Sequence, residues 1–296
     1  MFDKIVGIDP LGLTAEAEQE LRQLAGTCIL YPDLPKEEEI AQRIADADCA
    51  LVSFRSQISA KTIQRCPNLR YIGMCCSLYD EKSANVDLIA ARQQGIEVTG
   101  VRDYGDNGVV EFIVSELVRL LHGFGQFQWR EQPHELWGAK IGIIGMGATG
   151  LLTARALRVF GAEICYYSRT RKPAVEAEGF AYLPLEQLLA HVDILSTHLN
   201  KNTIVLHDRE FERFGDHKIL INTGIGPSFD LEAMTAWLSR GDNYYICDPV
   251  AMAPGTESLL KFPKVLCANK GSGGSIQTTQ RLSAKVLENM RAFLAR

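Results

Sequence analysis

Apolar runs alternate with helix-like segments from one end of the chain to the other. In the first third, short apolar runs lie at residues 4–8, 28–32, 49–54, 71–75 and 96–99. Amphipathic stretches separate them, as at 14–25 and in the run E-E-E-I-A-Q-R-I. A βαβα rhythm of this kind predicts a parallel sheet with helices on both faces.

A second series of the same kind follows a long helical pattern. Residues 108–124 carry apolar side chains at helical spacing, and the polar, proline-containing stretch 129–138 is typical of a linker. Apolar runs then recur at 139–145, 163–167, 192–198, 218–223, 244–248 and 264–268, and a helical pattern covers 275–294. We therefore predict an α/β protein with two doubly wound parallel-sheet domains.

Composition and charge exclude several classes of function. The 296 residues are 46% hydrophobic and 23% charged, with a formal net charge of −5, which argues against a nucleic-acid-binding surface. We expect no membrane partner, because no apolar stretch reaches the length of a membrane span, and the charged N-terminus does not resemble a signal peptide. A cytoplasmic protein is therefore expected.

The cysteines do not indicate a metal site. The eight cysteines form no C-x-x-C pair, and no histidine lies at ligand spacing from them. Most lie in or beside apolar runs, where a free cysteine behaves as a small hydrophobic residue. We therefore expect reduced cysteines and no metal.

A dinucleotide motif follows the apolar run at the start of the second series. Residues 141–150 read I-G-I-I-G-M-G-A-T-G, which places G-x-G-x-x-G between a strand and a helix. Gly145 permits a tight turn, Gly147 lets the backbone approach a pyrophosphate, and Gly150 allows close helix packing. Ala148 and Thr149 lie at the helix N-terminus, which attracts anions. The alternative is a glycine-rich turn that binds no ligand.

The end of the next predicted strand favours NADP(H) over NAD(H). An NAD site places Asp or Glu there to bind the ribose 2′-hydroxyl, whereas this chain has Ser168, Arg169, Thr170 and Arg171. Hydroxyl groups and cations suit a 2′-phosphate. Alternatively, the two arginines are solvated loop residues.

Several motifs in order resemble the D-isomer-specific 2-hydroxyacid dehydrogenase family. They include P-N-L-R-Y-I-G-M, Q-Q-G-I-E-V-T, E-L-W-G-A-K-I-G-I-I-G-M-G-A-T-G, S-T-H-L-N-K-N-T and K-I-L-I-N-T-G-I-G-P-S-F-D. The stretch Y-Y-S-R-T-R-K is similar to the glyoxylate and hydroxypyruvate reductase branch. The resemblance implies a small-molecule substrate, an active site in the cleft between two domains, and a homodimer.

The resemblance also implies domain bounds and cofactor contacts. A Rossmann nucleotide domain over 107–272 would be inserted into a flavodoxin-like substrate domain made of 1–106 and 273–296. The positions that would lie along the dinucleotide are His198, Leu199, Asn200, Thr223 and Gly224, and Asp248 corresponds to the residue that binds the nicotinamide carboxamide.

The catalytic signature of the family departs from its pattern here. Ile225 stands where the family has its substrate-binding Arg, and residues 249–254 contain no carboxylate in place of the family's Glu. Lys270 lies nearest to the position of the catalytic His. A protonated lysine stabilises a developing alkoxide, so Lys270 is a candidate proton donor. The alternative is a surface-loop lysine.

Three further catalytic candidates lie in the first domain. Arg55 follows the run at 49–54, whereas Arg102 and Tyr104 follow the run at 96–99. Each is a candidate to contact substrate, although a salt bridge, a cap or hinge packing would also explain it. The loop 75–82 lacks the glycine of the family's substrate loop. We therefore predict an NAD(P)-dependent oxidoreductase that reduces a carbonyl or 2-oxo acid. A catalytically weak dinucleotide sensor is the alternative.

Overall fold

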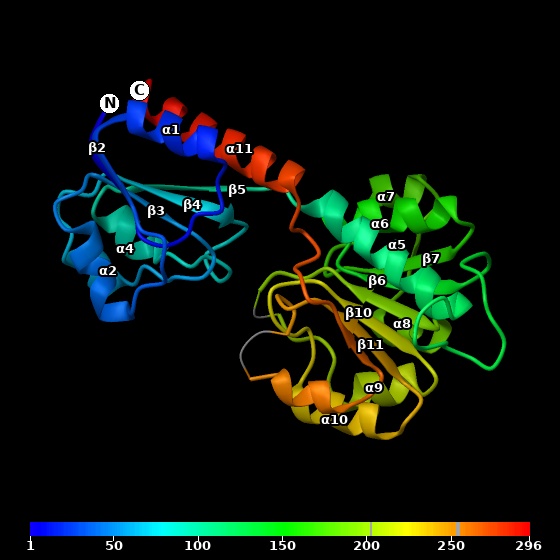
Figure 1. Cartoon of the computed structure of the whole chain (residues 1–296). Coiled ribbons are helices and arrows are strands. Elements are labelled where there is room, and N and C mark those ends of the chain that lie inside the picture. Colours follow the sequence, from blue (N-terminus) through cyan, green and yellow to red (C-terminus); the bar gives the residue numbers. More distant parts are fainter. Residues whose placement is uncertain (202, 253–254) are drawn as a thin grey trace. The chain divides into compact units, whose positions relative to one another are not determined.

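The computed structural model describes residues 1–201, 203–252 and 255–296, and the chain forms two compact units (Figure 1). Unit 1 comprises Met1–Tyr104 and Ser275–Arg296, and unit 2 comprises Gly105–Gly274. Unit 1 is therefore assembled from two separate segments of the chain, with unit 2 between them in the sequence.

Unit 1 is a five-stranded parallel sheet flanked by helices. Its elements are β1 (Phe2–Gly7), α1 (Ala15–Gln23), β2 (Ala25–Leu30), α2 (Glu37–Ile44), β3 (Cys49–Val52), α3 (Ala60–Gln64), β4 (Tyr71–Ser77), α4 (Leu88–Gln93), β5 (Glu97–Val101) and α11 (Ile276–Leu294). The strand order is β2-β1-β3-β4-β5, and Ile5 of β1 pairs with Cys28 of β2 and with Cys49 of β3. The strand order reverses between β1 and β3.

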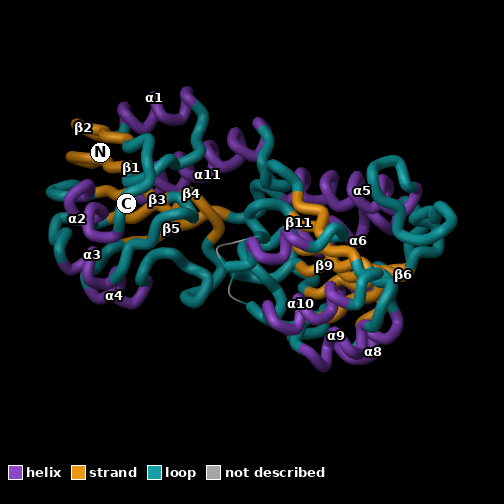
Figure 2. Tube along the Cα trace, turned by 60° about the horizontal axis from the view of Figure 1, so that its bottom comes forward, coloured by secondary structure: helices purple, strands orange, loops and turns teal. Residues whose placement is uncertain are grey.

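Two apolar layers cover the faces of this sheet. Helices α1 and α11 pack on one face, and α2, α3 and α4 pack on the other (Figure 2). Helix α11 contributes four buried side chains at helical spacing, Leu282, Val286, Leu287 and Met290. Burying one such side chain stabilises a fold by about 1.5–3 kcal/mol, so the C-terminal helix is a substantial part of this core.

Unit 2 is built on a seven-stranded parallel sheet. Its elements are α5 (Asp106–His122), β6 (Lys140–Ile144), α6 (Ala148–Val159), β7 (Glu163–Tyr167), α7 (Pro173–Ala177), β8 (Ala181–Tyr182), α8 (Leu185–His191), β9 (Ile194–Thr197), α9 (Asp208–Phe214), β10 (Ile219–Asn222), α10 (Leu231–Ser239), β11 (Tyr244–Cys247), the 3-10 helix η1 (Glu257–Lys261) and β12 (Val265–Cys267). The strand order is β12-β11-β10-β9-β6-β7-β8. The predicted α/β class with two parallel sheets is confirmed.

Short polar residues begin several of these helices. Thr14, Ser59, Asp87, Asp230 and Ser275 each accept a hydrogen bond from a backbone N–H in the first turn of the helix that follows. Such caps satisfy N–H groups that have no partner within the helix. The helix predicted over 108–124 is α5, which ends at His122 because Gly123 takes a left-handed conformation with φ of 69°.

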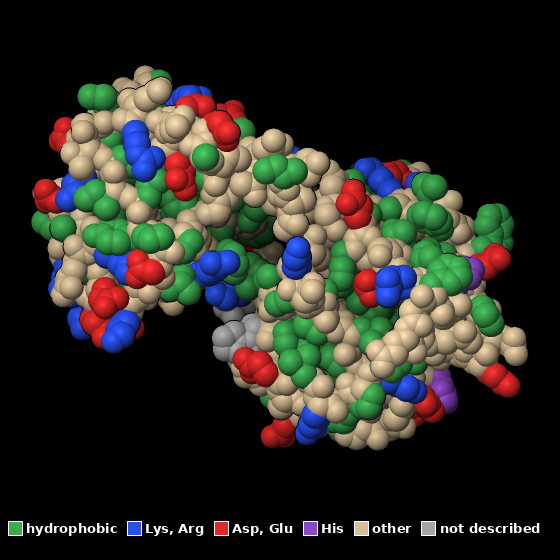
Figure 3. Space-filling model, in the orientation of Figure 1, with side chains coloured by type: hydrophobic (Ala, Val, Ile, Leu, Met, Phe, Trp, Pro, Cys, Tyr) green, Lys and Arg blue, Asp and Glu red, His purple; other side chains and the backbone are tan. Residues whose placement is uncertain are grey.

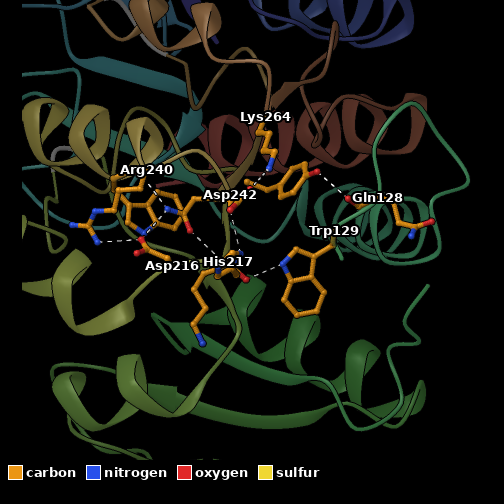
Figure 4. Close-up of polar contacts among 11 residues, drawn as sticks. Gln128, Trp129, Asp216, His217, Arg240, Asp242 and Lys264 are labelled. Atoms are coloured by element: carbon orange, nitrogen blue, oxygen red, sulfur yellow. Dashed lines mark hydrogen bonds and ion pairs between the residues drawn. The ribbon is translucent and has the colours of Figure 1, made fainter. Parts of the chain in front are cut away.

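The predicted linker at 129–138 is wrong, because this stretch is a loop inside unit 2. Trp129 Nε1 donates to the carbonyl of His217 over 3.0 Å, and Tyr244 Oη donates to the carbonyl of Gln128 over 2.9 Å (Figure 4). His217 and Tyr244 precede or begin the strands β10 and β11. The loop is therefore attached to the amino edge of the sheet by the Trp129 side chain and the Gln128 backbone, whereas polar side chains such as Glu131 and Gln132 are exposed.

Further polar contacts join the loops at this amino edge. Asp242 pairs with Lys264 at 2.9 Å and lies 3.6 Å from His217 Nδ1 (Figure 4). Asp216 pairs with Arg240 at 3.2 Å, and Asn243 Nδ2 donates to the carbonyl of Trp237 over 2.8 Å. The amino edge of unit 2 is thus closed by mutually satisfied polar groups.

The charges on the surface are mixed. Lys and Arg side chains alternate with Asp and Glu over the face that Figure 3 shows. Within the described residues, no helix is both long and apolar enough to cross a membrane. A search of the same residues finds no group of three or more His, Cys, Asp or Glu that could hold a metal ion.

Candidate active site

The carboxyl ends of β6 and β9 mark the point where the strand order of unit 2 reverses. The two strands are neighbours, with Ile144 opposite Thr197, although β7 and β8 lie between them in the sequence. In open α/β sheets, ligands bind in the crevice outside the strand ends at such a point. The predicted dinucleotide motif lies at the end of β6.

The three glycines of the motif occupy different environments. Gly145 has φ of +94°, and a Cβ there would lie 2.2 Å from the carbonyl oxygen of His198. A Cβ on Gly150 would lie 2.1 Å from the carbonyl oxygen of Gly145. A Cβ on Gly147 would meet nothing within 4 Å. Gly145 and Gly150 are therefore required for packing, whereas Gly147 leaves open space, as a site for a pyrophosphate requires.

Helix α6 starts at Ala148, directly after this open space. Its free N–H groups and its dipole favour an anion at this end. The hydroxyl of Thr149 donates to the Asp106 carboxylate at the start of α5, so it connects two helices. The motif thus has the local geometry of a phosphate-binding turn, with Thr149 also acting as a helix contact.

The two arginines at the end of β7, Arg169 and Arg171, differ in their contacts. Arg171 donates through Nε and Nη2 to the Glu176 carboxylate, and it lies 5.1 Å from the centre of the Tyr182 ring. Arg169 is exposed and forms no ion pair or hydrogen bond with the described residues. The hydroxyl oxygen of Ser168 accepts from Met146 N over 2.9 Å, which ties the end of β7 to the glycine turn. Thr170 is exposed.

The residues after β9 approach the glycine turn. His198 N donates to the Ile144 carbonyl over 2.8 Å, and the Leu199 side chain lies beside Gly145. His198 Nε2 lies 3.0 Å from the hydroxyl of Ser196. Desolvation of the ring lowers the pKa of His198 to about 4, so the imidazole is neutral at neutral pH. Asn200 follows and is half-buried.

A buried asparagine organises the turn after β10. Asn222 is 2% exposed, and its side chain accepts from Gly224 N over 3.0 Å and donates to the Gly226 carbonyl over 2.9 Å. Thr223 and Ile225, which lie in the same turn, are half-buried. The turn that carries Ile225 is therefore held in a defined conformation by the side chain of Asn222.

The ends of β11 and β12 come together beside that turn. Gly226 N donates to the Val250 carbonyl over 3.1 Å, and Ser272 N donates to the Asp248 carboxylate over 2.7 Å. The other carboxylate oxygen of Asp248 accepts from Val250 N and Ala251 N. Asp248 is thus 1% exposed and holds two loops together, a role that its position in the sequence did not indicate.

Lys270 lies in the turn between β12 and Ser272. Its side chain is exposed, and within the described ranges its ammonium group forms no ion pair or hydrogen bond. The structure therefore brings Lys270, Asp248 and the Ile225 turn to the same edge of unit 2. Of residues 249–254, where the resemblance places the family's Glu, Ala253 and Pro254 lie outside the described residues.

The candidates of unit 1 lie at the carboxyl edge of its sheet. Arg102 Nε donates to the Leu78 carbonyl over 2.7 Å, and its Nη2 donates to the Tyr79 carbonyl over 3.1 Å. The hydroxyl of Tyr104 hydrogen-bonds Ser77, and burial raises its pKa to about 12. Both residues therefore hold the loop that follows β4.

Arg55 differs from these two residues because its side chain holds no other part of the chain. Its guanidinium lies 5.5 Å from the centre of the Phe54 ring and forms no polar contact with the described residues. Its backbone N donates to the hydroxyl of Ser53 over 3.2 Å. Ser53 in turn contacts Asp9, a buried residue that directly follows the first apolar run and belongs to no recognisable sequence motif.

Comparisons with known proteins agree with this fold and motif. Residues 116–269 match the model of the D-isomer specific 2-hydroxyacid dehydrogenase NAD-binding domain. A hydroxypyruvate reductase of Blautia hydrogenotrophica is 27% identical and covers 91% of this chain and 89% of its own length. A glyoxylate reductase of Thermococcus gammatolerans is 32% identical and covers 70% of this chain and 69% of its own length.

A solved structure shows the same fold over the whole chain. An acyclic imino acid reductase in complex with NADPH and D-Arg superposes with a TM-score of 0.84 at 20% identity, covering 99% of this chain and 97% of its own. The match of the nucleotide domain and the relative of more than 30% identity establish the family. The chain belongs to the D-isomer specific 2-hydroxyacid dehydrogenase family of NAD(P)-dependent oxidoreductases.

Proposed function

We propose that the protein is an NADP(H)-dependent reductase of a small 2-oxo acid. The observation that carries this proposal is the glycine turn at the strand-order reversal of unit 2, with open space at Gly147 in front of α6. The substrate class comes from the relatives, which are named as hydroxypyruvate and glyoxylate reductases.

The described residues fit the cofactor at both of its ends. Gly145, Gly147, Ala148, Thr149 and Gly150 would hold the pyrophosphate at the N-terminus of α6. The 2′-phosphate of the ribose would lie by Ser168, Arg169 and Thr170, whereas Arg171, which the sequence also suggests as a contact, is engaged by Glu176 and is not part of the proposed site. At the nicotinamide end the proposed contacts are His198, Leu199, Asn200, Thr223, Gly224 and Asp248. When bound, the cofactor supplies the hydride that reduces the carbonyl carbon.

Arg55 is the proposed ligand of the substrate carboxylate. Its guanidinium is exposed, has no polar partner in the described part of the chain, and is presented from a turn at the carboxyl edge of its sheet. A hydrogen bond to a charged group contributes about 1.5–3 kcal/mol. Arg102 and Tyr104 would shape the substrate loop at residues 77–79 through the contacts described above.

Lys270 is the proposed proton donor, replacing the family His. Its ammonium would donate to the oxygen that gains negative charge during reduction, and a positioned acid contributes about 10²–10⁴-fold in rate. The neighbouring Ile225 leaves that turn without the family's cation. A lysine that stays protonated favours reduction over the reverse oxidation, because the reverse direction requires a free base.

The test is turnover of glyoxylate, hydroxypyruvate and pyruvate with NADPH and with NADH. We expect faster reduction with NADPH and a loss of at least about 100-fold in kcat for Lys270→Ala and Lys270→Met. Wild-type turnover by both variants would remove Lys270 from the mechanism. Tight NADPH binding without turnover of any of the three acids would instead favour a dinucleotide sensor.

A homodimer through unit 2 is proposed as the working form. Phe124, Trp137 and Val159, which all lie in unit 2, are 70%, 77% and 85% exposed and are therefore accessible to a second copy of the chain. Light scattering should give twice the chain mass for the wild type. It should give the single-chain mass for the double variant Trp137→Glu/Val159→Glu. An identical mass for the two proteins would contradict this interface.

A further inference from the structure

A carboxylate is buried at the end of the first strand of unit 1. Asp9 is 1% exposed, and both of its oxygens accept hydrogen bonds from a single residue, Ser53. Ser53 N donates to Oδ1 over 2.8 Å, and the hydroxyl of Ser53 donates to Oδ2 over 2.7 Å. No Lys or Arg forms an ion pair with Asp9 in the ranges that the structure describes. Burying a carboxylate without a cation is costly, so this placement calls for a reason.

This pair lies at the strand-order reversal of unit 1, the place where doubly wound sheets generally bind ligands. Asp9 follows β1 and Ser53 follows β3, and the strand order of the sheet reverses between these two neighbouring strands. The crevice outside such a reversal is the general ligand site of doubly wound sheets. The Asp9–Ser53 contact therefore lies at the base of the candidate substrate site of this unit.

The contact fixes the backbone turn that carries Arg55. The hydroxyl of Ser53 gives its proton to Asp9, which leaves its oxygen to accept from Arg55 N over 3.2 Å. From the other side, Asn85 Nδ2 donates to the carbonyls of Ser53 and Ser56 over 2.6 and 2.5 Å. The residues on either side of Phe54 and Arg55 are thus held by buried polar groups, whereas the Arg55 guanidinium is free of polar partners among the described residues.

A second buried aspartate in the same unit, Asp48, has the contacts expected of a purely structural residue and serves as a comparison for Asp9. Asp48 is 7% exposed and accepts from Asp3 N over 3.1 Å and from Lys4 N over 2.9 Å, but it also pairs with Arg70 at 2.9 Å. It precedes β3 and lies at the amino edge of the sheet. Asp48 therefore has a cation and no relation to the substrate edge, in contrast to Asp9.

We propose that Asp9 is a positioning residue for substrate binding, which acts by holding the 53–56 turn so that Arg55 meets the substrate carboxylate. This proposal rests on the proposed function, in which Arg55 binds that carboxylate. Asp9 itself is buried beneath the turn and touches no substrate. Its two acceptor oxygens match the N–H and O–H of Ser53, an arrangement that a neutral amide reproduces only in part.

The experiment measures KM for glyoxylate, kcat, the NADPH dissociation constant and the melting temperature in parallel. For Asp9→Ala we expect a rise in KM of about tenfold or more, with kcat and NADPH affinity within about threefold of the wild type. Asp9→Asn should recover part of the loss, because its carbonyl oxygen still accepts from Ser53 N. Asp48→Asn is the matched control, and it should lower the melting temperature without raising KM.

A double-mutant cycle shows whether Asp9 acts through Arg55. Asp9→Ala combined with Arg55→Ala should have the same KM as Arg55→Ala alone, because the orientation of an absent side chain has no effect. If Asp9→Ala does not fold, Ser53→Ala serves in its place, since it loses the hydroxyl and keeps the backbone contact. A raised KM for Arg55→Ala with an unchanged KM for Asp9→Asn and Ser53→Ala would overturn the positioning role. An unchanged KM for Arg55→Ala would instead overturn the role of Arg55 in the proposed function, and with it the inference.

Discussion

Arg169→Ala should specifically weaken the binding of NADPH. Arg169 is exposed and, in the described residues, has no carboxylate or carbonyl to bind, so its guanidinium is available to the 2′-phosphate. A hydrogen bond to a charged group contributes about 1.5–3 kcal/mol, and each 1.4 kcal/mol is a factor of ten in affinity. The dissociation constant for NADPH should therefore rise about 10- to 150-fold, toward the lower end at physiological salt because the site faces water.

The control is the neighbouring Arg171, whose guanidinium already pairs with Glu176. The double variant Arg171→Gln/Glu176→Gln removes an ion pair and leaves the local net charge unchanged. We expect its NADPH affinity to stay within about threefold of the wild type. Titration of nucleotide fluorescence with NADPH and with NADH gives both constants, and NADH binding should change by less than about threefold in every variant.

The result that refutes this reasoning is also specific. If Arg169→Ala weakens NADPH and NADH equally, the residue does not read the 2′-phosphate. If the double variant loses as much NADPH affinity as Arg169→Ala, the ion pair between Arg171 and Glu176 does not withhold Arg171 from the cofactor.

Three further outcomes are expected. Gly147→Ala should keep the wild-type melting temperature but lose at least about tenfold in NADPH affinity, because its Cβ enters the open space in front of α6. Gly145→Ala should unfold at a lower temperature, because its Cβ collides with the backbone of His198; differential scanning fluorimetry and nucleotide titration check both variants. The folded-state pKa of His198 lies below the usual value near 6.5, so the unfolded chain binds more protons between about pH 6.5 and 4. The free energy of unfolding therefore falls as the pH drops through that window. Urea unfolding should show a smaller fall for His198→Gln than for the wild type, and equal falls would contradict the lowered pKa of His198. Ile225→Arg alone should not confer strong 2-hydroxyacid dehydrogenase activity if, as we propose, Lys270 replaces the family His and residues 249–254 lack the family Glu. Robust oxidation of glycerate by this single variant would contradict that proposal.

The sequence predicts the parts of the fold that depend on local pattern. Apolar periodicity identifies both sheets. The glycine spacing places the turn after β6, because each glycine meets a local steric requirement. The distinct reasons for Gly145 and Gly147 follow from the motif and agree with their surroundings in the structure. These inferences succeed because they need only residues that are close in the chain.

Contacts between distant loops were not predictable in the same way. Ser53 and Asp9 are 44 residues apart, and Asn85 is 32 residues from Ser53. Their meeting depends on the order and register of strands, which apolar periodicity does not encode. The loop at 129–138 has the composition of a linker for the same reason, because its composition does not encode the contacts that Trp129 and Gln128 make near β10 and β11.

The two-segment construction of unit 1 has a consequence for the order of folding during synthesis. The face of its sheet that α1 and α11 cover is completed by Leu282, Val286, Leu287 and Met290, and the hydroxyl of Ser283 accepts from Thr14 N over 2.9 Å at the start of α1. A ribosome synthesises these residues after the whole of unit 2. One apolar face of the sheet formed by the first hundred residues is therefore covered only by α1 while unit 2 is synthesised. Unit 2, which is continuous in the chain, is in a position to fold first, and nascent chains that stop before α11 should be the species that chaperones hold.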